Sequence, residues 1–99
     1  MLLIAADNWF RDNRDKLIET SIGEIDYYPP DRDDSLSFGF EAENFVYQVV
    51  IWEEGYIKVL RLDKQTMTED VENVQARDSK ELINRLNDFL MECLKNNMH

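Results

Sequence analysis

Apolar positions recur at helical spacing near the start of the chain. The apolar residues Ala6, Phe10 and Leu17 and the polar Asn13 follow one another at steps of four, three and four residues, which places them on one face of a helix. That face is widened by three further apolar residues, Leu3, Trp9 and Ile18. The pattern predicts a helix over about residues 3–19, and Gly23 lies just beyond it, where a helix is expected to end.

The period then changes to two, which predicts strands. The expected strands cover residues 25–28, 35–41, 45–52, 56–62 and 67–76. The third run is apolar on both faces apart from Gln48, so we expect it at the centre of the sheet. The fourth run carries apolar residues of both parities, which predicts a β-bulge or two covered faces. The fifth run is mostly polar and predicts an edge strand, with an irregular connection as the alternative.

The last segment predicts a second helix. Asp78 can cap its N-terminus, and Glu81, three residues later, would complete a capping box. Lys95 falls in the final turn, where a cation suits the helix dipole. The core-facing stripe of this helix is formed by Leu82, Leu86, Phe89, Leu90, Cys93 and Leu94.

These elements predict an α+β fold in a single domain, residues 1–99. We expect an N-terminal helix, an antiparallel meander sheet of four to five strands and a C-terminal helix, because sequence-adjacent strands joined by short turns usually pair. Both helices are expected on one face of the sheet, the simplest two-layer arrangement. The other face would carry Val46, Val50 and Trp52 or their neighbours of opposite parity. Apolar residues on a face without helices would form a binding surface or a dimer interface.

The distribution of charge adds a functional expectation. The formal net charge is -10, and residues 24–54 hold nine acids against one base, Arg32. Such a field speeds encounter with a positively charged partner and rejects anionic ones. Nucleic-acid binding is disfavoured, because it requires clustered Lys and Arg to neutralise phosphates. The sequence therefore favours a protein-binding surface.

Residues for catalysis or cofactor binding are sparse. The only histidine is His99, the last residue, and Cys93 lies on the apolar stripe of the second helix, where it is expected to be a buried small hydrophobe. The run Asp31, Asp33, Asp34 resembles the start of a calcium loop, but Leu36 stands where the glycine of such a loop is required. We therefore expect neither an enzyme nor a metal or cofactor site.

Cysteine content and hydropathy bear on the compartment. A single cysteine permits no internal disulfide, which fits a reducing compartment. The apolar N-terminus lacks a basic region and is interrupted by Asp7 and Asn8, unlike a signal peptide. No stretch approaches the roughly 20 apolar residues of a membrane span. A cytoplasmic protein without membrane association is expected.

The order of elements and several local motifs resemble a known class of protein. The chain opens with a helix containing Trp9 and Phe10, continues through a strand ending Val50-Ile51-Trp52-Glu53-Glu54-Gly55, and closes with a capped, leucine-rich helix. In these features it resembles bacterial immunity proteins of polymorphic toxin systems. The nearest group is the TriTu type, which is thought to neutralise ADP-ribosyltransferase toxins that act on the translation elongation factor Tu. The resemblance implies an α+β fold and a cognate toxin as partner.

Charge and resemblance together predict a partner-binding site. Tyr28 and Trp52 are expected to anchor a toxin with a basic surface, since interface hot spots favour aromatic residues. The electrostatic part of the site is expected to comprise Asp31, Asp33, Asp34, Glu41, Glu43, Glu53 and Glu54. We expect a monomer or weak dimer. The alternatives are an acidic secretion chaperone, which usually has a helix within the strand series, and a DNA mimic, which presents its acids in extended rows.

Overall fold

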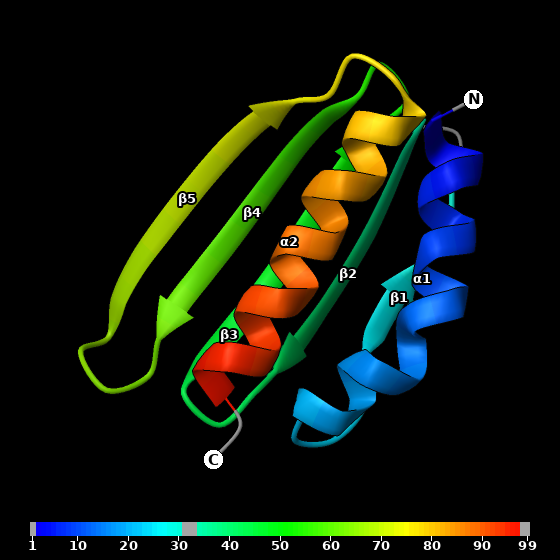
Figure 1. Ribbon diagram of the computed structural model, residues 1–99. Helices are drawn as coiled ribbons and strands as arrows, with labels where there is room; N and C mark the ends of the chain where they lie inside the picture. The colour runs from blue at the N-terminus through cyan, green and yellow to red at the C-terminus, as the bar shows by residue number, and fades with distance from the viewer. Residues whose placement is uncertain (1, 31–33, 98–99) are drawn as a thin grey trace.

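The computed structural model describes residues 2–30 and 34–97 and confirms the α+β fold (Figure 1). An N-terminal helix precedes five strands and a C-terminal helix. In chain order these are α1 (Leu2–Thr20), β1 (Asp26–Tyr28), β2 (Ser35–Glu41), β3 (Phe45–Trp52), β4 (Tyr56–Asp63), β5 (Thr68–Gln75) and α2 (Ser79–Asn97).

The five strands form one antiparallel meander in the order β1-β2-β3-β4-β5. β3 is central, as predicted from its apolar character, and residues 68–75 form the predicted polar edge strand. The β-bulge considered for residues 56–62 is absent, because β4 pairs in unbroken register with both β3 and β5. The odd-numbered and even-numbered apolar residues of β4 lie on opposite faces of the sheet. Ile57 and Val59 are buried towards the helices, whereas Leu60 and Leu62 are half-buried on the face without helices.

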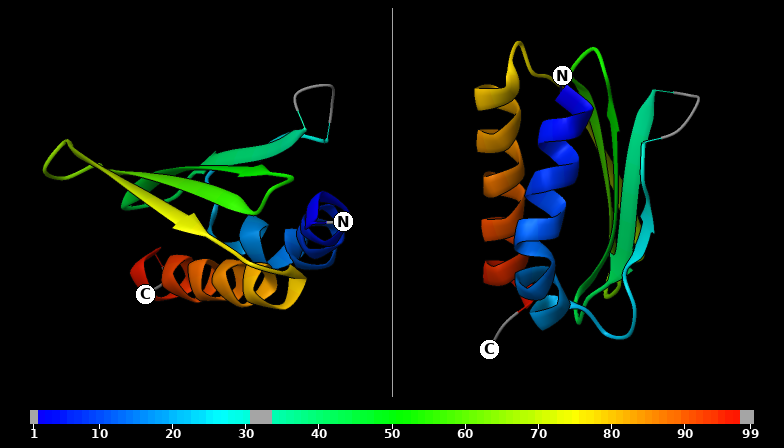
Figure 2. Two further views of the ribbon diagram at one scale, coloured as in Figure 1. Left: turned by 90° about the horizontal axis from the view of Figure 1, so that it is seen from above. Right: turned by 90° about the vertical axis from the view of Figure 1, so that its right-hand side faces the viewer.

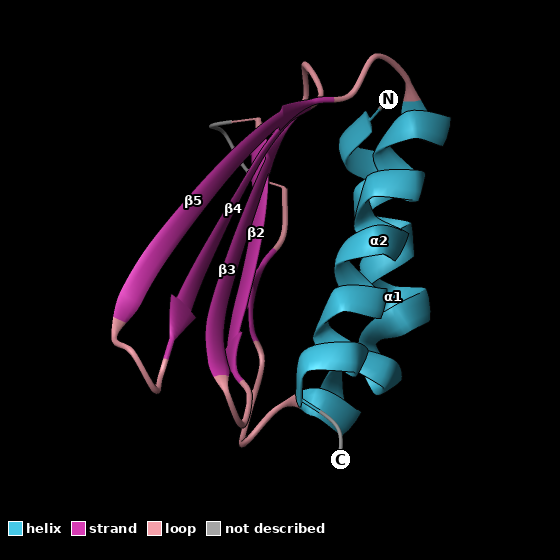
Figure 3. Ribbon diagram, turned by 60° about the vertical axis from the view of Figure 1, so that its left-hand side comes forward, coloured by secondary structure: helices cyan, strands magenta, loops and turns pink. Residues whose placement is uncertain are grey.

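Both helices pack side by side on one face of the sheet, as predicted, and leave the opposite face bare (Figures 2 and 3). The core forms where the period-two residues of β2 and β3 meet the helical stripes. Aromatic rings connect the layers. The ring of Phe38 on β2 lies 5.1 Å from that of Phe10 on α1 and 6.1 Å from that of Phe89 on α2, and Tyr47 on β3 meets Phe89 edge-on at 5.3 Å.

The ends of α2 are held by side chains. The Asp78 carboxylate accepts a hydrogen bond from the Glu81 backbone N–H at 2.8 Å, which confirms the predicted cap. The Glu81 carboxylate instead accepts from Arg77 Nε at 3.4 Å, so the second half of the capping box is replaced by an ion pair. At the other end the Asn97 amide donates to the Tyr47 hydroxyl at 2.9 Å and accepts from the Asn44 backbone N–H at 3.0 Å. These bonds fasten the last helical turn to the β2–β3 connection.

Candidate functional site: the open face of the sheet

The face of the sheet without helices carries a band of apolar side chains, and we call it the open face. Strand register places its residues in rows across the sheet. Val50 lies between Ser37 and Lys58, and Leu60 lies between Gln48 and Val71. The apolar residues of the band are Val46, Val50, Trp52, Tyr56, Leu60, Leu62 and Val71. Because side chains alternate along a strand, this band is separate from the core beneath the helices.

Two aromatic residues mark one end of the band. The Trp52 and Tyr56 rings meet edge to face, with centroids 5.9 Å apart. Tyr56 is 39% exposed, so this pair offers aromatic surface to a partner. Beside it Val50, Trp52 and Leu60, with Gln48 and Lys58, line a hollow of about 220 Å³.

A second hollow, of about 470 Å³, lies on the open face over Gly39. Gly39 pairs with Asp26 on one side and Gln48 on the other, and its lack of a side chain leaves space between them. The walls include the aromatic ring of Tyr28 and the carboxylates of Glu24, Asp26 and Glu41. This hollow therefore combines an aromatic wall with an acidic one.

Acids outnumber bases around the open face. Asp26, Glu41 and Glu69 occupy the ends and edges of the strands on this face, and Lys58 is the one base among the described strand residues there. Glu41 also pairs with Lys64, whose Nζ lies 2.5 Å from Oε2. The open face is thus apolar at its centre and acidic at its margin.

The structure separates the predicted partner-binding residues into two groups. Tyr28, Asp34 and Trp52 lie near one end of the sheet, close to the β3–β4 turn that holds Glu53 and Glu54. The other group, Glu41 and Glu43, lies at the β2–β3 connection, roughly 20 Å away along β2 at about 3.3 Å per residue. Asp31 and Asp33 lie outside the described residues. A partner that contacts both groups must therefore span the length of the sheet.

Two of these acids have structural interactions that the sequence did not indicate. The Glu53 carboxylate accepts hydrogen bonds from the backbone N–H groups of Leu2 and Leu3, at 3.2 and 3.1 Å, and so caps α1 from 50 residues away. Asp34 adopts φ 52° and its carbonyl accepts from the Glu53 backbone N–H at 2.9 Å. Glu53 therefore joins the β3–β4 turn to the first helix.

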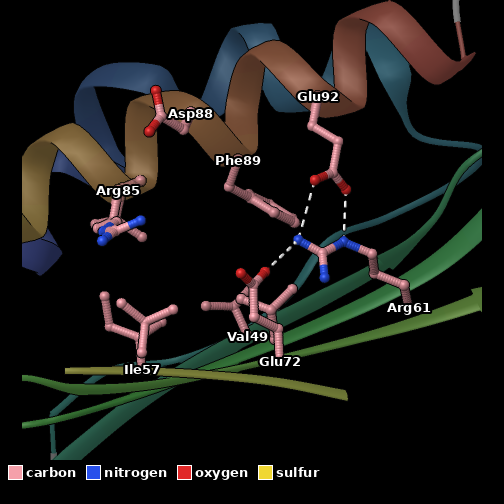
Figure 4. Close-up of a pocket in the computed structure, with 11 residues that line it drawn as sticks. Val49, Ile57, Arg61, Glu72, Arg85, Asp88, Phe89 and Glu92 are labelled. Atoms are coloured by element: carbon pink, nitrogen blue, oxygen red, sulfur yellow. Dashed lines mark hydrogen bonds and ion pairs between the residues drawn. The ribbon is translucent and has the colours of Figure 1, made fainter. Parts of the chain in front are cut away.

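A charged cleft on the helix side of the sheet was also missed by sequence reasoning (Figure 4). It lies between α2 and β5, has a volume of about 220 Å³, and has an apolar floor that includes Val49, Ile57 and Phe89. Arg61, with its side chain 16% exposed, contacts three carboxylates at its rim. Glu92 accepts from Nε at 2.6 Å and from a terminal nitrogen at 3.0 Å, Glu72 accepts at 2.8 Å, and Asp70 lies at 3.3 Å.

These carboxylates explain how a partly buried arginine is tolerated. Burial alone would lower the pKa of Arg61, but the hydrogen bonds to Glu92 and Glu72 outweigh it and raise that pKa. The register of the β4–β5 hairpin could have predicted that Asp70 lies opposite Arg61. Glu92 could not have been found this way, since its position depends on how α2 packs on the sheet. Arg61 therefore has its counter-charges within the protein, whereas the side chains of Asp70 and Glu72 remain 74% and 49% exposed beside it.

Two titratable side chains of the core, Cys93 and Tyr47, have raised pKa values. Cys93 is fully buried, as predicted, and burial raises the pKa of its thiol, which disfavours the thiolate needed for nucleophilic chemistry. Burial likewise raises the pKa of Tyr47. Within residues 2–30 and 34–97, no group of three or more His, Cys, Asp or Glu side chains is arranged to hold a metal ion.

Comparisons with protein-family models, with curated proteins and with solved structures found no match to this chain. In the part of the chain that the structure describes, neither helix combines the length and the apolar character needed to cross a membrane.

Proposed function

We propose that this chain is an immunity protein that binds and neutralises a cognate antibacterial toxin domain through the open face of its sheet. The observation that carries the proposal is an uncovered apolar band with an acidic margin on an otherwise strongly acidic protein. An exposed apolar surface with a polar margin is typical of a protein–protein interface.

The side chains of the open face suit such an interface. Trp52 and Tyr56 supply the kind of aromatic anchor that dominates binding energy in many complexes. The hollows beside Leu60 and over Gly39 can each receive a side chain of the partner. Asp26 and Glu41 at the margin, with the net charge of -10, would speed association with a basic toxin and oppose association with nucleic acid.

The resemblance to TriTu-type proteins makes an ADP-ribosyltransferase domain the first toxin to test. Such a partner would be met in the bacterial cytoplasm, by a monomer or weak dimer of this chain. The secretion-chaperone alternative expects a helix within the strand series, and residues 67–76 are the segment that could have supplied it. In the structure this segment forms a strand, β5 (Thr68–Gln75). That finding favours the immunity function over the chaperone function.

Co-expression tests the proposal. A bacterial ADP-ribosyltransferase toxin domain is expressed in a laboratory bacterium with and without this chain, and growth and co-purification are measured. We expect rescue of growth and a stable complex. Continued killing despite well-folded, abundant chain would reject the proposed pairing.

A matched pair of variants tests which surface binds the toxin. Tyr56→Arg changes the open face, and Ile18→Arg changes a residue of similar exposure on α1, at 39% and 46% respectively. We expect Tyr56→Arg to abolish rescue while the protein stays folded, and Ile18→Arg to retain it. Loss of rescue with Ile18→Arg but not with Tyr56→Arg would indicate that the toxin binds the helices instead.

A further inference from the structure

The outer edge of β5 is an unpaired strand edge eight residues long. Among residues 2–30 and 34–97 no segment pairs with it, and β5 lies at the free edge of the sheet, with neither helix running along its outer side (Figures 1 and 3). Natural proteins usually discourage pairing at such an edge with charged side chains, proline or a bulge. β5 contains no proline and its register with β4 is unbroken, so its protection consists of acidic charge, carried by Glu69, Asp70 and Glu72, which opposes acidic strands but not basic ones.

The register identifies which backbone groups of β5 point outward. The Ala76 N–H donates to the Gly55 carbonyl at 2.8 Å, so Ala76 directs its hydrogen-bonding groups towards the preceding strand. Residues two apart in an antiparallel pair share this direction. The intervening residues therefore direct their N–H and C=O groups away from β4. These residues are Glu69, Val71, Asn73 and Gln75.

The side chains of β5 define what can bind beside it. On the helix side Asp70 and Glu72 lie next to the edge, and Glu69 lies on the open face, so the strand carries three acids and no base. Val71, which is 45% exposed, extends the apolar band of the open face to the edge. A second copy of β5 would bring three more acids alongside, and like charges on adjacent strands are destabilising.

We propose that the outer edge of β5 binds, by strand addition, an extended protein segment in which basic residues alternate with apolar ones. The basic residues would lie on the helix side beside Asp70 and Glu72, and the apolar residues would lie on the open face beside Val71. The backbone of the segment would pair with the outward groups of Val71 and Asn73. This site is distinct from the centre of the open face and does not depend on the identity of a toxin.

A synthetic peptide of nine residues, alternating Lys and Val, is the probe. A second peptide of the same composition, with its lysines contiguous, has equal charge but cannot place all of them on one side of a strand. Calorimetric titration of the chain with each peptide separates strand addition from general attraction to an acidic protein. We expect the alternating peptide to bind at least about tenfold more tightly, a difference of about 1.4 kcal/mol.

Asn73→Pro removes one outward N–H and obstructs the edge while leaving the hydrogen bonds to β4 intact. The matched control Asn73→Thr retains the N–H. We expect Asn73→Pro to weaken binding of the alternating peptide about tenfold or more, and Asn73→Thr to leave it unchanged. Circular dichroism checks that both variants are folded.

Hydrogen exchange on the unaltered chain gives a readout that does not depend on the folding of any variant. The alternating peptide should slow exchange at the amides of Glu69, Val71, Asn73 and Gln75. Unchanged exchange at these amides, or equal affinity for the two peptides, would overturn the proposal. Self-association of the chain that Asn73→Pro abolishes would also overturn it, because the edge would then bind a second copy.

Discussion

The bond from Glu53 to the start of α1 gives the sharpest quantitative prediction. Its carboxylate accepts from the N–H groups of Leu2 and Leu3, and α1 has no acid in its own first turn. Glu53→Ala therefore leaves two N–H groups without their acceptor and removes a carboxylate bonded to the positive end of this helix dipole. Loss of a helix cap costs about 0.5–2 kcal/mol, and a partly buried charge at a helix terminus contributes up to about 2 kcal/mol. We expect the free energy of unfolding to fall by about 1–2 kcal/mol.

Urea unfolding measures this effect, with Glu54→Ala as the matched control. Glu54 is adjacent in sequence and exposed, and only its backbone carbonyl accepts a bond, from Gln75. Both variants change net charge equally, so the difference between them isolates the cap. Glu54→Ala should change stability by no more than about 0.5 kcal/mol. For a domain of this size, Glu53→Ala should lower Tm by roughly 4–8 °C per kcal/mol. Equal effects of the two substitutions would refute the capping role of Glu53.

Three other features of the structure lead to predictions about stability: the buried Cys93 and Tyr47, the ion pairs of Arg61, and the glycines with positive φ. Burial raises the folded-state pKa of Cys93 and Tyr47, so their stabilising contribution is complete below the unfolded pKa values and is lost as pH rises. Urea titrations should show that the free energy of unfolding falls above about pH 9, by about 1.4 kcal/mol per pH unit for each group that is ionised in the unfolded chain. A free energy of unfolding that stays constant up to about pH 11 would contradict this. Arg61→Met leaves Glu72 and Glu92 facing each other and should cost about 1–3 kcal/mol, partly recovered in high salt. Arg11, whose side chain is exposed although its partner Asp7 is not, is the control, and Arg11→Met should cost under about 1 kcal/mol. Gly55 and Gly23 both have positive φ, but only at Gly55 would an added Cβ clash, at 2.2 Å from the Ala76 carbonyl oxygen. Thermal unfolding should therefore show that Gly55→Ala is the more destabilising substitution, whereas Gly23→Ala costs only about 1–2 kcal/mol.

Local periodicity was sufficient to predict the fold because the two helices and the strands β2, β3 and β4 each bury one face. Leu36, Phe38 and Phe40 alternate with polar residues and form one row of the core, and Asp78 marks the start of α2. The interpretation of residues 56–62 failed on one point. Apolar residues on both faces of this run predict a β-bulge or two covered faces, whereas Leu60 belongs to a regular strand and lies half-buried on the open face.

The contacts between distant elements could not be predicted in this way. The cap from Glu53 to α1 and the ion pair from Arg61 to Glu92 depend on how the helices dock, which no local pattern encodes. The acidic residues of the predicted site follow from charge alone, and the structure shows that Glu41 and Glu53 also form bonds within the protein. Their part in binding a partner stays a prediction. Tyr56 was not among them, because its exposure on the open face follows from the β4 register.

The central claim is that the open face, and not the helical layer, contacts the toxin. Methyl NMR of the chain, free and bound to the toxin domain, tests it most directly. The account predicts large shifts at Val50, Leu60 and Val71 on the open face and none at Ile4 and Ile18, which are exposed on α1. Shifts confined to Ile4 and Ile18, with Val50 and Leu60 unchanged, would contradict it.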